Sequence, residues 1–102
     1  MYLFQILLPL FTKNNRQISR AEFSRVNDEL TKRYGGVTSY MRAPAEGLWI
    51  TSGNKKARDQ IVTIEVMTST RAKRWWRKYQ KTLERRFDQQ YVVIRYQVCK
   101  TI

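Results

Sequence analysis

The fold of this chain is decided by residues 59–98, which read DQIVTIEVMTSTRAKRWWRKYQKTLERRFDQQYVVIRYQV. Residues 59–68 and 91–99 alternate apolar and polar side chains, so each segment is predicted to be a strand with one buried face. Between them, apolar residues three or four positions apart predict an amphipathic helix over residues 71–86, with Ser69 or Thr70 as its cap. Together the three segments form the strand–helix–strand half of a small domain.

The N-terminal half repeats this order. Residues 2–11 are apolar at both parities apart from Gln5, which predicts a central strand covered on both faces. Ser19 then begins a helix, with Glu22 three residues later as a capping box. The helix is predicted to run to about Tyr34, where the glycine pair 35–36 ends it.

The middle of the chain supplies the second strand. Residues 37–43 are predicted to be extended, residues 44–47 to interrupt the strand with a proline and a glycine, and residues 48–51 to resume it. A turn is expected at residues 52–54 and a basic loop at residues 55–58.

The whole chain, residues 1–102, therefore reads as one α+β domain of the order β-α-β-β-α-β. We predict the ferredoxin-like arrangement, a four-stranded antiparallel sheet with two helices on one face and the first and third strands in the centre. The sheet face away from the helices is predicted to be half apolar, which favours a homodimer formed through it. Its residues on the last two strands would be Ile61, Thr63, Glu65, Met67, Val93, Arg95 and Gln97.

Positive charge is concentrated in the second helix. The chain has a formal net charge of +12, and residues 71–86 hold eight Lys or Arg against a single acid, Glu84. Like charges at this spacing repel one another, whereas Glu29 in the first helix can pair with Arg33. We predict an anionic partner, either nucleic acid or an acidic protein; a solubilising surface is the alternative. The predicted anion-binding residues are Arg71, Lys73, Arg74, Arg77, Lys78, Lys81 and Arg85.

Trp75 lies at the edge of the apolar stripe of that helix. It could stack on a base or contact Arg71 and Lys78, although burial at the sheet edge is the simpler interpretation.

Several classes of function are excluded by composition. Histidine is absent, which excludes His-based acid–base catalysis, Ser-His-Asp triads and His-containing metal sites. We expect no metal and no cofactor. The single cysteine, Cys99, cannot form an internal disulfide, which favours a reducing, cytoplasmic location. Residues 2–11 are too short to span a membrane and lack a basic flank, so a secretion signal is the minor alternative.

A second constellation combines Gln5, Glu65 and Arg95, which share the outer sheet face if Gln5 has the matching parity. One interpretation is a buried ion pair that fixes register at a dimer interface. The other is a ligand pocket in which Glu65 acts as a base and Arg95 anchors an anion. Glu46 is a further loop candidate, although a surface turn is the simpler interpretation.

Two familiar families with this topology are disfavoured by their own requirements. An RNA-recognition motif needs stacking aromatics on its central strands, and residues 61–67 contain none. Cas2-like nucleases place an acidic metal ligand at the end of the first strand, and residues 2–11 contain no acid.

The order of short motifs resembles a group of small uncharacterised bacterial domains. The matching features are an apolar first strand, Phe23, Arg33, a Gly-x-Trp segment at 47–49 and an aromatic-rich helix that ends Phe-x-Gln at 87–89. This resemblance implies the same α+β topology and no activity.

We therefore expect a small non-catalytic binding module whose basic second helix engages an anionic partner. The alternative is a small enzyme of the dimeric α/β-barrel type that acts on a small organic substrate.

Overall fold

A computed structural model describes the backbone of residues 1–50 and 56–102, and the side chains of residues 1–40 and 60–102. Its elements, in chain order, are β1 (Tyr2–Pro9), α1 (Arg20–Tyr34), β2 (Thr38–Ile50), β3 (Lys56–Thr68), α2 (Lys73–Arg86) and β4 (Val93–Val98). The predicted β-α-β-β-α-β order is confirmed.

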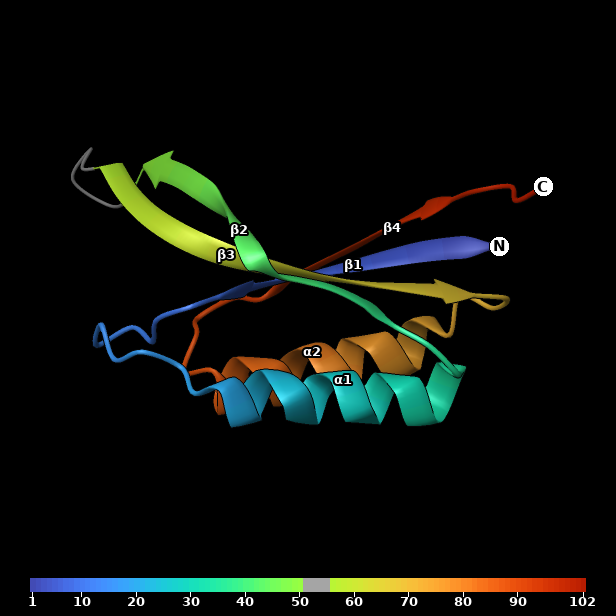
Figure 1. Cartoon of the computed structure of the whole chain (residues 1–102), viewed down its shortest axis with the longest axis horizontal. Helices are drawn as coiled ribbons and strands as arrows, with labels where there is room; N and C mark the ends of the chain where they lie inside the picture. The colour runs from blue at the N-terminus through green and yellow to red at the C-terminus, as the bar shows by residue number, and fades with distance from the viewer. Residues whose placement is uncertain (51–55) are drawn as a thin grey trace.

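The four strands form one antiparallel sheet in the order β2-β3-β1-β4, so β1 and β3 are central as predicted. Both helices lie against the same face of the sheet, and no described element covers the opposite face (Figure 1). We call this uncovered surface the open face. The two ends of the chain meet at one end of the sheet, where the Cys99 amide donates to the Met1 carbonyl at 3.0 Å.

The core lies between the sheet and the two helices, because alternate residues of β1 and β3 point toward the helical stripes. Trp76 of α2 stacks on Phe4 of β1 with ring centroids 4.3 Å apart. Each large side chain buried in this way contributes about 1.5–3 kcal/mol. The buried hydrophobic residues are Phe4, Ile6, Leu8, Ile18, Phe23, Val26, Leu30, Val62, Ile64, Val66, Trp76, Tyr79, Leu83, Phe87 and Val92.

The helix ends agree with the sequence only in part. Gly35 ends α1 in the left-handed conformation, with φ of 86°, and its amide donates to the Thr31 carbonyl, as predicted. Ser19 is the N-cap, but its side chain makes no capping hydrogen bond, so the predicted capping box is wrong. The N-cap of α2 is Ala72, with φ of 42° and no side-chain cap, rather than a hydroxyl residue.

The strands also differ from their predicted limits. β2 continues through residues 44–47 instead of stopping, and the irregularity appears as a register shift between Tyr40 and Ala45. The shift includes Pro44, which has no amide hydrogen to donate. An edge strand such as β2 tolerates this, because one of its sides has no neighbouring strand among the described residues to bond. β3 begins at Lys56, so most of the predicted basic loop is strand. The predicted turn at 52–54 lies outside the described residues.

The helices are joined by a contact that the sequence did not reveal. Glu29 of α1 pairs with Arg86 of α2 through two hydrogen bonds of 2.5 and 2.6 Å, and it also accepts one from the Tyr79 hydroxyl. The predicted pair of Glu29 with Arg33 is therefore wrong. Arg33 instead lies over the ring of Trp75, at 4.2 Å from its centroid. No described helix is both long and apolar enough to cross a membrane.

Candidate functional site

A row of polar side chains crosses the open face, with one residue from each strand. Glu65 of β3 and Arg95 of β4 both lie opposite Gln5 of β1 in the strand register, and Tyr40 of β2 completes the row. We call these four residues the polar row. The structure thus brings together the three residues of the predicted ligand pocket and adds Tyr40, which the sequence analysis missed. Its position could be found only once the register of β2 was known.

Hydrogen bonds link the polar row from end to end. The Tyr40 hydroxyl donates to Glu65 at 3.1 Å, and the Gln5 amide nitrogen donates to the other oxygen of the same carboxylate at 2.6 Å. The Gln5 amide oxygen accepts from Nε of Arg95 at 2.8 Å. Gln5 therefore lies between an anion and a cation and is hydrogen-bonded to both, which fixes the orientation of its amide.

The two ends of the row differ in chemistry. The hydrogen bond to the Glu65 carboxylate is the main cause that raises the pKa of the Tyr40 hydroxyl above its ordinary value, so Tyr40 stays a donor. At the other end, the terminal nitrogens of Arg95 have no hydrogen-bond partner among the described residues. They can receive a carboxylate in the two-point geometry that guanidinium groups favour.

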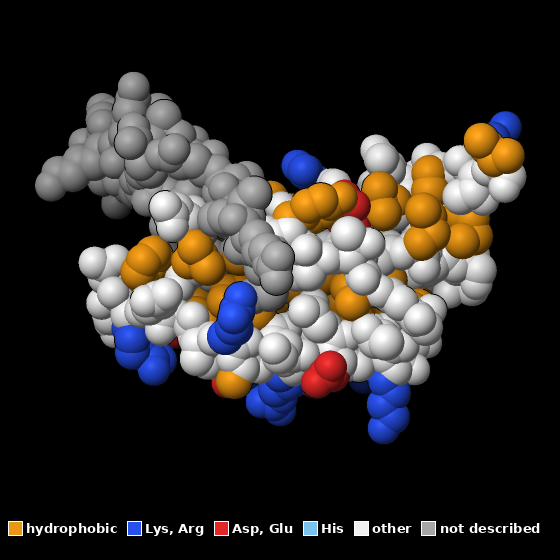
Figure 2. Space-filling model, in the orientation of Figure 1, with side chains coloured by type: hydrophobic (Ala, Val, Ile, Leu, Met, Phe, Trp, Pro, Cys, Tyr) orange, Lys and Arg blue, Asp and Glu red, His pale blue; other side chains and the backbone are white. Residues whose placement is uncertain are grey.

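Apolar side chains surround the row. Leu3 and Leu7 flank Gln5 along β1, and both are partly exposed. Met67 and Val93, on the neighbouring strands, are 41% and 38% exposed. Figure 2 shows hydrophobic side chains along the sheet side of the molecule, and Lys and Arg side chains projecting from the helix side. The open face thus presents a charged centre in an apolar frame, which favours a ligand or a partner that covers it.

The predicted anion-binding residues, which lie in α2 or just before it, separate into two groups. Arg71, Lys73 and Arg77 line a groove between α2 and β4. The other four do not line it, and Lys81 forms an ion pair with Glu84 at 3.5 Å. Those four residues, which we call the outward group, are Arg74, Lys78, Lys81 and Arg85.

Two of the eight cations between residues 71 and 86 have carboxylate partners among the described side chains, namely Lys81 and Arg86. The remaining six form no ion pair within that part of the chain. The single acid of α2, Glu84, has a structural role: its buried carboxylate accepts a hydrogen bond from the backbone amide of Val92 at 3.1 Å. It holds the segment that leads into β4, a role the sequence pattern did not indicate.

The other predictions for site residues have simple outcomes. Trp75 is partly buried and stacks on Tyr79, and its cationic neighbour is Arg33 rather than Arg71 or Lys78. Glu46 lies in β2 opposite Gln60, not in a turn, and its side chain lies outside the described residues. Among the described residues, no group of three or more acidic, His or Cys side chains could hold a metal ion.

Comparison with known proteins gives one informative result. No family model and no curated protein matches the chain, so the resemblance to small bacterial domains stays a prediction. The fold is similar to the solved structure of a phage SAM lyase in complex with S-methyl-5'-thioadenosine. The TM-score is 0.66 at 15% identity, and the match covers 94% of this chain and 79% of that one. At this identity the likeness establishes a shared fold.

Proposed function

We propose that this protein is a small enzyme that binds S-adenosylmethionine on the open face and breaks its sulfur–carbon bond to the amino-acid chain. The observation that carries the proposal is the hydrogen-bonded polar row, with the Glu65 carboxylate and the Arg95 guanidinium on either side of Gln5. The similar fold of a phage SAM lyase supports it. The ligand of that structure, S-methyl-5'-thioadenosine, is S-adenosylmethionine without its four-carbon chain.

The charges of the row match those of the substrate. S-adenosylmethionine carries an ammonium group, a sulfonium centre and a carboxylate. Glu65 would bind the cationic ammonium, and the terminal nitrogens of Arg95 would bind the carboxylate. The apolar frame of Leu3, Leu7 and Val93 would reduce the water beside a bound substrate, which strengthens both attractions.

The reaction needs no cofactor, base or water. A carboxylate oxygen of the substrate attacks its own γ-carbon while the bond from that carbon to sulfur breaks. The electron pair of the broken bond stays on sulfur, so the sulfonium becomes the neutral thioether of S-methyl-5'-thioadenosine. The other product is a five-membered lactone that keeps the ammonium charge, so atoms and charge balance. The contribution of the protein is to hold the four-carbon chain of the substrate in the bent conformation that brings the carboxylate oxygen to the γ-carbon.

The test is the appearance of S-methyl-5'-thioadenosine when the purified protein is incubated with S-adenosylmethionine, followed by liquid chromatography and mass spectrometry. A protein-free sample corrects for spontaneous breakdown of the substrate. We expect Glu65→Gln and Arg95→Gln each to lower the rate by about a hundredfold, as for loss of one charged transition-state contact. Asp28→Asn removes a charge from α1 and should leave the rate unchanged. A wild-type rate equal to that of the protein-free sample would refute the proposal.

A second candidate function is binding of an anionic partner through α2. It is favoured by the six cations that lack ion pairs among the described side chains. Retention on heparin should then fall steeply with salt, because bound phosphates or sulfates release counterions. Reversing the charge of Arg74, Lys78 and Lys81 should abolish retention without unfolding the domain. Retention that does not depend on salt would remove this candidate.

A further inference from the structure

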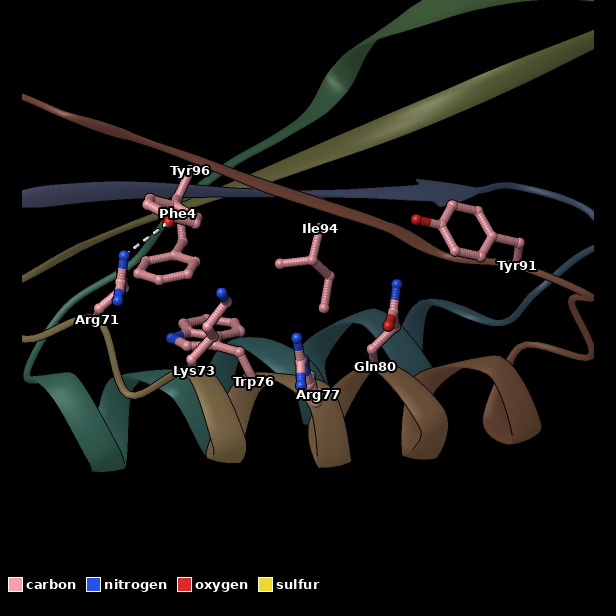
Figure 3. A pocket seen from close by; sticks show the side chains of 9 residues that line it. All are labelled: Phe4, Arg71, Lys73, Trp76, Arg77, Gln80, Tyr91, Ile94 and Tyr96. Atoms are coloured by element: carbon pink, nitrogen blue, oxygen red, sulfur yellow. Dashed lines mark hydrogen bonds between the residues drawn. The ribbon is translucent and has the colours of Figure 1, made fainter.

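On the helix side of the sheet, a groove of about 220 Å³ runs between α2 and β4. Figure 3 shows Arg71 at one end of it, Lys73 next, Arg77 about midway and Tyr91 at the other end. We call it the α2–β4 groove. It lies on the opposite side of the sheet from the polar row, so it is a separate site. Its volume is below the range of about 300–1,000 Å³ typical of pockets that enclose drug-sized ligands, so it can cover only part of a ligand of that size.

The positive charge at one end of the groove favours an anionic ligand. None of Arg71, Lys73 and Arg77 has a carboxylate partner among the described side chains. Arg71 is held in place by a hydrogen bond from its guanidinium to the Tyr96 hydroxyl at 3.3 Å, drawn in Figure 3. The first turn of α2 contains no acid and has no side-chain cap. Its free backbone amides add positive potential at the same end.

An independent observation at this end points to a missing acceptor. Trp76 lines the groove and is 4% exposed, and its indole nitrogen is buried without a hydrogen-bond partner among the described residues. A buried donor without a partner is destabilising, because it has lost its hydrogen bonds to water. In Figure 3 the indole nitrogen lies between Arg71 and Lys73, so an oxyanion bound there would supply the acceptor that it lacks.

The other end of the groove offers a surface for a planar ring. Tyr91 is 66% exposed at this end, whereas Tyr96 stacks on Phe4 beside Arg71 at the cationic end and is 40% exposed. Gln80 lies near Tyr91 (Figure 3), and its amide nitrogen is fixed by the Val92 carbonyl at 2.7 Å, which leaves the amide oxygen to accept. Exposed aromatic rings beside cations are the usual partners of a nucleic-acid base and its phosphate.

We propose that the α2–β4 groove binds one nucleotide unit, with the phosphate among Arg71, Lys73 and Arg77 and the base stacked on Tyr91. The unit is either a free mononucleotide or one residue of a single strand. This inference does not depend on the lyase proposal. It gives a defined ligand to three of the cations of the second candidate function.

The test uses isothermal titration calorimetry of the full chain with AMP, adenosine, inorganic phosphate and a short oligothymidylate. We expect AMP to bind at least tenfold more tightly than adenosine or phosphate alone. The double variant Lys73→Gln/Arg77→Gln should weaken AMP binding at least about a hundredfold, because it removes two charged contacts to the phosphate. The matched control Arg74→Gln/Lys78→Gln removes the same charge from the outward group and should change binding less than about twofold.

Three further variants locate the ligand. Tyr91→Ala should weaken AMP but not phosphate, and Trp76→Phe, which keeps the ring packing, should weaken both. Glu65→Gln should leave AMP affinity unchanged, which separates this site from the polar row. If oligothymidylate displaces AMP, the unit comes from a single strand; if it does not, the unit is a free nucleotide. Equal losses in the two double variants, or AMP no tighter than phosphate, would overturn the proposal.

Discussion

At the scale of single residues, Glu29 is the charged group that links the two helices, because it accepts hydrogen bonds from Arg86 and Tyr79. Its hydrogen bonds with Arg86 are the main cause that lowers the pKa of the carboxyl below its ordinary value of 4.5, with a further contribution from the Tyr79 hydroxyl. Burial raises the pKa of the Tyr79 hydroxyl above its ordinary value, and the hydrogen bond to Glu29 raises it further. One carboxylate thus fixes two side chains of α2 against α1.

The lowered pKa of Glu29 predicts how stability depends on acid. A group whose pKa is lower in the folded state contributes stability above its ordinary pKa of 4.5 and loses it as the pH falls through the folded value. Glu29→Gln should therefore lower the unfolding free energy by about 1 kcal/mol near neutral pH, because the pair is partly exposed. The difference from wild type should vanish in acid well below the ordinary pKa. Urea unfolding at the two pH values measures it.

The control for this prediction is the adjacent exposed acid. Asp28→Asn removes the same charge without touching Arg86, so it should leave stability nearly unchanged at both pH values. A Glu29→Gln variant whose deficit persists in acid would show that the contact acts through packing and not through ionisation.

At the scale of elements, α2 combines two opposed requirements. Its stripe of Trp76, Tyr79 and Leu83 is buried against the sheet, while its remaining surface carries like charges one turn apart. Only its last turn is favourably charged, because Arg85 and Arg86 lie at the negative end of the helix dipole. Packing therefore stabilises a helix that its own surface charges oppose.

This opposition predicts a stabilising substitution. Lys78 has Arg74 one turn before it and Lys81 one turn after it. Lys78→Gln should raise the melting temperature by about 2 °C at low salt, because two repulsive pairs of about 0.2–0.5 kcal/mol each are removed. The gain should disappear in high salt, which screens exposed charges. Thermal unfolding followed by circular dichroism at both salt concentrations measures it.

The matched control lies on α1. Lys32 has Asp28 and Glu29 one turn before it, so Lys32→Gln removes attraction instead of repulsion and should not raise the melting temperature. A stabilising effect of equal size at both positions would show that charge repulsion in α2 is not the cause.

At the scale of the whole molecule, the main feature is that helices cover only one face of the sheet. The helices cover one face, and the open face keeps Met67, Val93 and Tyr40 substantially exposed around the polar row. Apolar area of this kind is commonly covered by another molecule. A second copy of the chain on this face would also enclose the proposed substrate site.

We therefore predict self-association through the open face at micromolar concentration. Val93→Lys places a charge in that face and should weaken association at least about tenfold, the equivalent of about 1.4 kcal/mol. Sedimentation velocity measures it. Val98→Lys makes the same change on the same strand but with the opposite parity, so it should leave association intact. A wild-type protein that sediments as a monomer at these concentrations would contradict the prediction.

Much of the architecture could be read from local pattern. The alternation of Val62, Ile64 and Val66 and the helical spacing of Trp76, Tyr79 and Leu83 identified the strand, the helix and the faces they bury. Alternation also predicted that Glu65 and Arg95 lie on the same face of the sheet. Such patterns are reliable because side-chain direction repeats every two residues in a strand and every 3.6 in a helix.

The tertiary structure alone decided which polar groups meet. The sequence determined an α+β sheet with an exposed, half-apolar face and a strongly basic helix, because burial follows local periodicity. It could not determine that Glu29 pairs with Arg86, that Tyr40 joins Glu65, or that three of the cations share a groove with Tyr91. These contacts depend on strand register and helix packing between segments far apart in the chain, and a hydrogen bond tolerates errors of only a few tenths of an ångström.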